Sequence, residues 1–120
     1  MKAAGGGKII NFSSGIFYTG AAFWSHYGAS KGAVVGLTRS LARELGPHNI
    51  AINAIFPSLV MTDVTEKLPT AYVDRIVSAR CFARRQTPED IIGSVLFLAS
   101  HHSDFITGQI LNVDGGIILN

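Results

Sequence analysis

The sequence predicts an α/β fold: a partial, doubly wound parallel sheet of about three strands with flanking helices. Three short apolar runs alternate with two helical patterns and a stretch of shorter helical pieces. The apolar runs are of the near-continuous kind that a parallel sheet buries on both faces. Strands that alternate with helices in this way are usually parallel and joined by right-handed crossovers. We therefore expect helices to cover a small parallel sheet.

The first predicted strand is Lys8–Phe12, which follows three glycines at positions 5 to 7. A phosphate-binding loop follows a strand and opens a helix, whereas these glycines precede a strand. We therefore interpret them as a flexible turn that leads into the strand. A loop over residues 15–25 comes next, and we expect part of its aromatic set to be core. The set consists of Phe17, Tyr18, Phe23 and Trp24.

The strongest helical pattern runs from Tyr27 to Gly46 and ends at Pro47. Glycines at positions 28, 32 and 36 each weaken the helix by about 1 kcal/mol relative to alanine. A helix that tolerates them is expected to pack closely against another backbone or a ligand. Its apolar residues recur at helical spacing and are expected to be buried. They are Ala33, Val34, Leu37, Leu41 and Leu45.

The second predicted strand is Asn49–Phe56, and Pro57 begins the loop that follows. Short helical pieces are predicted near residues 64–68 and 71–79. Thr87 is predicted as the N-cap of the last helix, with a proline and two acidic residues after it. The third strand, Gln109–Val113, ends in Asp114-Gly115-Gly116. The expected buried side of the last helix comprises Ile91, Ile92, Val95, Leu96 and Leu98.

Composition excludes several classes of protein. The 120 residues are 48% hydrophobic, enough for one domain's core, and carry a net charge of +2 with both signs interspersed, which favours neither nucleic acid nor a membrane surface as a partner. Arg80, Arg84 and Arg85 form the only basic cluster, interpreted as a solvated helix end or loop. The single cysteine, Cys81, excludes an internal disulfide and fits a reducing, cytoplasmic compartment. No run is long enough to span a membrane, and the four histidines suggest no metal site.

A Tyr, a Lys and a Ser carry the chemistry. Tyr27 and Lys31 are one helical turn apart on the same face. A unit charge about 4 Å from a phenol, at an effective dielectric constant of ~20, is worth about 4 kcal/mol and moves a phenol towards the range where a general acid or base works. Ser14 follows the first strand at its carboxyl end, where open α/β sheets bind ligands. The three side chains could therefore converge on one carbonyl or hydroxyl group.

This pattern resembles the signature of the short-chain dehydrogenase/reductase family, which is Tyr-x-x-x-Lys with a Ser thirteen residues before the Tyr. Ser14 has that spacing, whereas Ser13 is one residue too far. The resemblance extends, in order, over nearly the whole chain. The similar stretches are residues 9–14, 27–31, 53–57 and 108–116.

The resemblance implies a Rossmann-like fold, NAD or NADP as the cofactor, and hydride transfer to or from a secondary alcohol or ketone. Tyr27 would exchange the proton, Lys31 would assist it and hold the nicotinamide ribose, and Ser14 would hold the substrate oxygen. The family is commonly tetrameric, which implies a homo-oligomer. The loop after the second strand would meet the nicotinamide carboxamide, although a serine stands at position 58 where glycine is usual. The implied cofactor-binding residues are Tyr27, Lys31, Pro57, Ser58, Val60 and Thr62.

Residues 1–120 are expected to form a single partial domain, the C-terminal catalytic half of a dinucleotide-binding fold. The sequence contains no glycine-rich turn from a strand into a helix and no acidic residue placed for a ribose. The N-terminal phosphate-binding half, which also selects between NAD and NADP, is therefore expected to be absent. We expect the isolated chain to be inactive.

Alternatives remain at two levels. The aromatic loop and Ser58 favour a hydrophobic or aromatic substrate, with a 3-oxoacyl thioester as the alternative. A serine hydrolase is a further hypothesis, because residues 28–32 match Gly-x-Ser-x-Gly and Asp90 and His101 follow in the required order. However, Ser30 falls inside a predicted helix, where no nucleophile elbow can form. A non-catalytic association module is the third reading, and a glycine-rich strand-turn-helix encoded upstream would argue against it.

Overall fold

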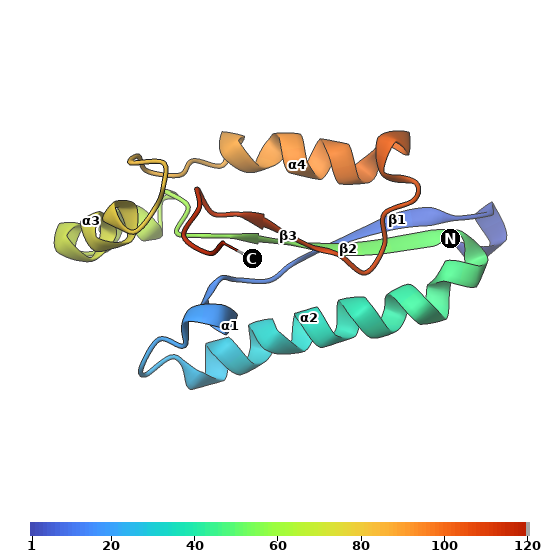
Figure 1. The fold of residues 1–120 in the computed structure, drawn as a ribbon, viewed down its shortest axis with the longest axis horizontal. Coiled ribbons are helices and arrows are strands. Elements are labelled where there is room, and N and C mark those ends of the chain that lie inside the picture. The colour runs from blue at the N-terminus through green and yellow to red at the C-terminus, as the bar shows by residue number, and fades with distance from the viewer. Residues whose placement is uncertain (120) are drawn as a thin grey trace.

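The computed structural model describes residues 1–119 and consists of a three-stranded parallel sheet between two helices (Figure 1). The predicted α/β class is confirmed. Helix α2 covers one face of the sheet and α4 the other, while α1 and α3 lie towards one end of the molecule. The strands are β1 (Gly7–Phe12), β2 (Ile50–Pro57) and β3 (Ile110–Val113). The helices are α1 (Ile16–Thr19), α2 (Ser25–Leu45), α3 (Thr70–Ser78) and α4 (Glu89–Ala99), with short 3₁₀ turns at Lys2–Ala4, Gly46–His48, Thr65–Lys67 and His101–Ser103.

The register brings the three strand ends together. Strand β1 pairs with β2 from Gly7 opposite Ile50 to Phe12 opposite Ile55, and β2 pairs with β3 up to Pro57 opposite Val113. Because the strands are parallel, their carboxyl ends meet at one edge of the sheet, on the side where α3 lies (Figure 1). The loops that follow the three strands are therefore neighbours.

Strand β2 forms the centre of the core because it is the strand with a neighbour on each side. Ile52, Ile55 and Phe56 are each at most 1% exposed. The buried side-chain amide of Asn53 is hydrogen-bonded at both ends: its nitrogen donates to the Ile106 carbonyl at 2.9 Å, and its oxygen accepts from the Gln109 N–H at 3.0 Å. A buried amide with both ends paired costs little. Within residues 1–119, β1 pairs only with β2, so its other edge is open.

The predicted buried face of α2 is partly wrong. The residues that pack against the sheet are Val35, Thr38 and Ala42, whereas Leu37 is 52% exposed. The Thr38 hydroxyl accepts a hydrogen bond from the Asn11 amide at 3.0 Å, which accounts for a polar residue on the buried side. Leu37 is exposed because the sheet covers only one face of this long helix.

The glycines of α2 do not behave alike. A Cβ added at Gly32 would lie 2.8 Å from the Phe17 ring, so this glycine lets a side chain, rather than another backbone or a ligand, pack closely on the helix. Added carbons at Gly28 and Gly36 would meet nothing within 4 Å. Among these three glycines, close packing within residues 1–119 therefore occurs at Gly32 only, and its partner is an aromatic side chain instead of the predicted backbone or ligand.

Helix α4 departs from prediction in two ways. Of its expected buried side, only Leu98 is fully buried, while Ile92 and Leu96 are more than half exposed. Thr87 does not cap the helix through its side chain. Instead, the Asp90 carboxylate accepts the Thr87 N–H at 2.8 Å and two hydrogen bonds from the Arg84 guanidinium at 2.6 and 2.7 Å. These bonds hold the pKa of Asp90 well below its usual range.

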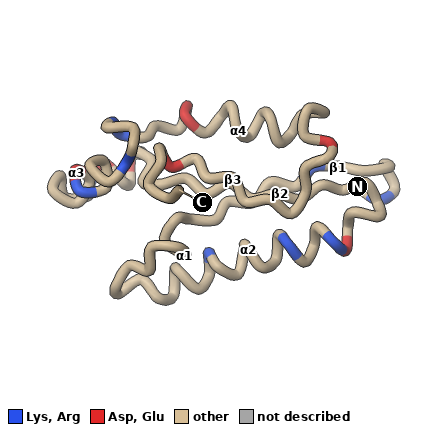
Figure 2. Tube along the Cα trace, in the orientation of Figure 1, with Lys and Arg blue, Asp and Glu red and all other residues tan. Residues whose placement is uncertain are grey.

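Charge is scattered along the described chain rather than gathered into one patch (Figure 2). Both signs occur, and neutral residues separate them along most of the trace. Among residues 1–119, no helix is both long enough and apolar enough to cross a membrane.

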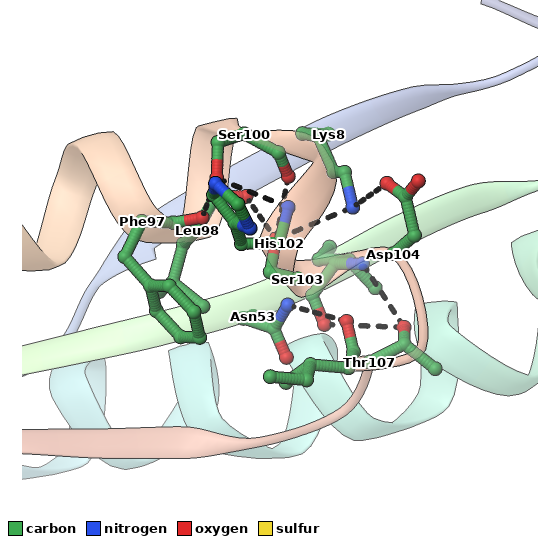
Figure 3. A network of polar contacts seen from close by, with 11 residues as sticks. Lys8, Asn53, Phe97, Leu98, Ser100, His102, Ser103, Asp104 and Thr107 are labelled. Atoms are coloured by element: carbon green, nitrogen blue, oxygen red, sulfur yellow. Dashed lines mark hydrogen bonds and ion pairs between the residues drawn. The ribbon is translucent and has the colours of Figure 1, made fainter.

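A polar network at the amino end of the sheet ties the segment after α4 to β1 and β2 (Figure 3). Lys8 Nζ lies 2.8 Å from an Asp104 oxygen and donates to the Ser103 hydroxyl at 3.3 Å. The Ser103 hydroxyl donates in turn to the Leu98 carbonyl, and Thr107 accepts the Ile52 N–H at 3.0 Å. The polar groups satisfy one another, at the end of the sheet opposite to the strand ends described above. We therefore interpret this network as structural.

Candidate active site

The two serines after β1 have different environments. Ser13 is 4% exposed, and its hydroxyl donates to the Lys31 carbonyl at 2.8 Å, which ties the end of β1 to α2. Ser14 is half-buried, and its hydroxyl oxygen accepts the Ile16 N–H at 3.4 Å. Accepting that bond leaves the Ser14 O–H as a donor. The Ser13 hydroxyl therefore stabilises the fold, whereas the Ser14 O–H can still donate a hydrogen bond to a ligand oxygen.

Tyr27 and Lys31 lie one turn apart on α2, as predicted. Lys31 Nζ is 5.7 Å from the centroid of the Tyr27 ring and donates to the Phe12 carbonyl at 3.0 Å. The ammonium group is thus held between the tyrosine ring and the last residue of β1, two residues before Ser14. The Trp24 ring meets the Tyr27 ring edge-on, with centroids 5.8 Å apart, and supports its orientation.

The aromatic loop is less buried than predicted. Phe17, Tyr18 and Trp24 are each between 42% and 48% exposed, and Phe23 is 98% exposed at a φ of 68°. The expectation of core residues in this loop is therefore wrong, although the Tyr18 ring lies 5.3 Å from that of buried Phe56. The loop instead presents apolar surface immediately before Tyr27.

The loop after β2 is held through its backbone. Ser58 N–H donates to Gln86 Oε1 at 3.1 Å, and Met61 N–H donates to the Gln86 carbonyl at 2.8 Å. The Thr62 N–H donates to the Thr65 hydroxyl at 2.7 Å, and that hydroxyl donates to the Val60 carbonyl at 2.6 Å. No group of residues 1–119 accepts a hydrogen bond from the Val60 N–H. This loop therefore retains a backbone donor at the carboxyl end of the sheet.

The structure thus brings some predicted site residues together and leaves others apart. Tyr27 and Lys31 meet near Phe12, the last residue of β1, and Ser14 follows two residues later in the chain. Pro57 ends the adjoining strand, so its loop shares that edge of the sheet. Across the described residues, no hydrogen bond joins this loop to Tyr27 or Lys31; its bonds lead to residues 65–66 and 80–86.

Two residues that sequence reasoning missed hold this loop. Arg80 is 8% exposed rather than solvated, and it donates from Nη2 to the Leu59 carbonyl and from Nη1 to the Arg84 carbonyl, both at 2.8 Å. Burial lowers the pKa of Arg80, and the Asp114 carboxylate opposes that effect. Gln86 is 6% exposed. Neither residue belongs to a periodic or spaced pattern, so the sequence carried no signal for them.

The hydrolase hypothesis does not match this geometry. Ser30 lies inside α2, and its hydroxyl donates to the Tyr27 carbonyl at 2.8 Å. Asp90 is paired with Arg84 at the start of α4, on the opposite side of the sheet from α2 (Figure 1). A nucleophile elbow requires the serine to stand at the end of a strand.

Comparisons with known proteins identify relatives over nearly the whole chain. The family model described as "Enoyl-(Acyl carrier protein) reductase" matches residues 1–118. The chain is 46% identical over 115 residues to "3alpha-hydroxysteroid dehydrogenase" of Mediterraneibacter gnavus, which covers 96% of this chain and 46% of that protein. It is 38% identical over 113 residues to a 3-oxoacyl-[acyl-carrier-protein] reductase of Thermotoga maritima, with 94% and 46% covered.

Solved structures give the same result. The structure of a 3-oxoacyl-[acyl-carrier protein] reductase from Brucella melitensis aligns with a TM-score of 0.93 and 34% identity, over 100% of this chain and 45% of that one. A short-chain type dehydrogenase/reductase from Mycobacterium ulcerans aligns with a TM-score of 0.88 and 32% identity, over 98% and 43%. The chain therefore spans about half the length of the relatives it matches.

Proposed function

Because the chain belongs to the short-chain dehydrogenase/reductase family, we propose that it is the catalytic half of an NAD(P)-dependent oxidoreductase. The reaction would move a hydride between the nicotinamide cofactor and a secondary alcohol or ketone. The observation that carries this proposal is the position of Lys31 Nζ, 3.0 Å from the Phe12 carbonyl and 5.7 Å from the centroid of the Tyr27 ring.

The residues present fit a nicotinamide cofactor. The carboxamide oxygen of a nicotinamide accepts hydrogen bonds. At the carboxyl end of the sheet, the Val60 N–H is a donor without a partner among residues 1–119. Lys31 would hold the ribose, and the backbone of residues 57–62 would hold the carboxamide. When bound, the cofactor supplies the hydride, and the protein supplies position and electrostatics.

Three side chains would handle the proton. In the reducing direction, Tyr27 would donate its phenolic proton to the carbonyl oxygen of the substrate, whose carbonyl carbon would take up the hydride. In oxidation, the Tyr27 phenolate would take the hydroxyl proton. The Lys31 ammonium stabilises that phenolate by charge. Ser14 donates its O–H to the substrate oxygen and orients it, in keeping with the bond that its oxygen accepts from Ile16.

The substrate is proposed to be a hydrophobic or aromatic secondary alcohol or ketone. Exposed aromatic surface at Phe23 and Trp24, directly before Tyr27, supports this choice. Relatives named for a hydroxysteroid and for 3-oxoacyl groups both match, so a 3-oxoacyl thioester is the second candidate.

A substrate panel tests this order. For a protein that carries both halves of the fold, we expect kcat/KM to be at least about tenfold higher for cyclic or aromatic ketones than for 3-oxoacyl thioesters, because one well-placed apolar contact is worth about that factor. Initial rates of NAD(P)H oxidation at 340 nm provide the measurement. A preference for the thioesters would reverse the order, and no reduction of either class would refute the proposed activity.

We also propose that the chain forms homo-oligomers. The open edge of β1 can pair with another strand, and Leu37, Ile92 and Leu96 are more than half exposed on the two helices. Light scattering after size-exclusion chromatography at micromolar concentration should give a mass well above 12.8 kDa for the isolated chain. A monodisperse 12.8 kDa species with a cooperative melt would contradict this expectation.

A further inference from the structure

We propose that Gln86, supported by Arg80, is a positioning residue for the loop of residues 57–62 and presents the Val60 N–H to the amide of the cofactor. Both side chains belong to the segment between α3 and α4, about 25 residues after the loop along the sequence. The inference rests on the proposed function, because it assigns a task within the same site.

Gln86 contacts two strand ends through its side-chain amide and its backbone carbonyl. Its Oε1 accepts the Ser58 N–H at 3.1 Å, and its Nε2 donates to the Val113 carbonyl at 2.6 Å. Its backbone carbonyl accepts the Met61 N–H at 2.8 Å. The side chain thus bridges the loop after β2 to the last residue of β3, from a position that is 6% exposed.

This pairing decides which way the Val60 N–H faces. Val60 and Gln86 form an isolated parallel bridge. In a parallel bridge the hydrogen bonds run through the residues that flank the bridged residue, so its own N–H points to the other side. The bond from the Met61 N–H to the Gln86 carbonyl fits this pattern, so the Val60 N–H is directed away from Gln86, without a partner among residues 1–119.

Arg80 also forms a hydrogen bond to the backbone of this loop. Its Nη2 donates to the Leu59 carbonyl at 2.8 Å, between the two residues that Gln86 holds. Its Nη1 donates to the Arg84 carbonyl, which braces the segment against itself. Buried hydrogen bonds of this kind are costly to lose, because the remaining partner is left without water. Three hydrogen bonds, at residues 58, 59 and 61, therefore fix the conformation of the loop.

The test is Gln86→Met, which keeps the length and apolar body of the side chain and removes both amide bonds. In a protein that carries both halves of the fold, we expect the KM for NAD(P)H to rise about tenfold, while kcat and the KM for the ketone stay within threefold. The factor corresponds to the loss of about one net hydrogen bond in binding. A role in stability alone would lower the melting temperature and leave the cofactor KM unchanged, which would overturn the proposal.

Amide hydrogen exchange reads the positioning directly and needs no activity. In Gln86→Met the Ser58 amide should exchange at least tenfold faster, whereas the Met61 amide, bonded to the Gln86 backbone, should change by less than threefold. Unchanged Ser58 exchange would overturn the inference. If Gln86→Met fails to fold, exchange is measured in the unsubstituted protein. There the Ser58 amide should exchange at least tenfold more slowly than an unprotected amide. Exchange at the unprotected rate would overturn the inference.

Gln109→Met is the matched control. Gln109 is exposed, lies at the amino end of β3, and donates from Nε2 to the Thr107 carbonyl at 3.1 Å. The Gln109→Met variant should change neither the KM for the cofactor nor the exchange rate of the Ser58 amide. A rise in the cofactor KM as large as that in Gln86→Met would overturn the specific role of Gln86. If the unsubstituted protein lacks dehydrogenase activity, the proposed function fails, and the exchange experiment still accepts or rejects the hold on the loop.

Discussion

Replacing Tyr27 with phenylalanine should lower kcat by at least a hundredfold in a protein that carries both halves of the fold, while cofactor binding changes by less than about threefold. The substitution removes the phenolic O–H and keeps the ring, so the contact with Trp24 at 5.8 Å and the neighbouring Lys31 are preserved. A positioned general acid or base typically contributes between 10² and 10⁴ in rate. Steady-state kinetics and NADH fluorescence titration would measure the two effects.

Two further variants make the result specific. Lys31→Ala should reduce both kcat and cofactor affinity, because the proposal assigns Lys31 to the phenolate and to the ribose. Tyr72→Phe is the matched control, since Tyr72 lies on α3 and its ring contacts Arg75 rather than the site. It should leave kcat unchanged. Retention of more than a few per cent of the parent kcat by Tyr27→Phe would refute the acid–base role.

The isolated 120-residue chain should bind no NADH at micromolar concentration and show no NAD(P)-linked activity. Pyrophosphate is held by the N-terminal N–H groups of a helix that follows a glycine-rich turn after a strand. In residues 1–119 the glycines at positions 5–7 lead into β1, and Gly115 and Gly116 follow β3 without a helix after them. The proposal assigns Lys31 and the Val60 N–H to the nicotinamide end of such a cofactor, where they would not hold the pyrophosphate.

Fluorescence titration of the purified chain with NADH is the measurement. Joining the chain to the amino-terminal half of a relative is the positive counterpart, and it should bring binding into the micromolar range. Micromolar binding by the isolated chain would refute this expectation and would mean that residues 1–119 hold the pyrophosphate without a glycine-rich turn.

Sequence reasoning predicted elements better than surfaces. The spacing of Leu37 with its apolar neighbours identified a helix correctly, and the helix formed over Ser25–Leu45. The same spacing failed to predict which face is buried, because an apolar stripe looks alike whether it packs on the chain's own sheet or stays uncovered. Likewise, residues 87–90 correctly predicted a helix start, but the N-cap is Pro88 rather than Thr87, and the Asp90 carboxylate accepts hydrogen bonds from the Thr87 N–H and from Arg84.

The sequence by itself determined the class of fold, the three parallel strands and the pairing of Tyr27 with Lys31. Local spacing carries these features: a helical turn places residues four apart side by side, and apolar runs between helices become parallel strands. Only the tertiary structure decided that the Ser13 hydroxyl donates to the Lys31 carbonyl, that Arg80 is buried, and that Gln86 bonds to the loop after β2. These contacts join residues 18 to 28 positions apart in the chain. Such pairs have no period or fixed spacing, and they exist only once the strand ends have been brought to one edge of the sheet.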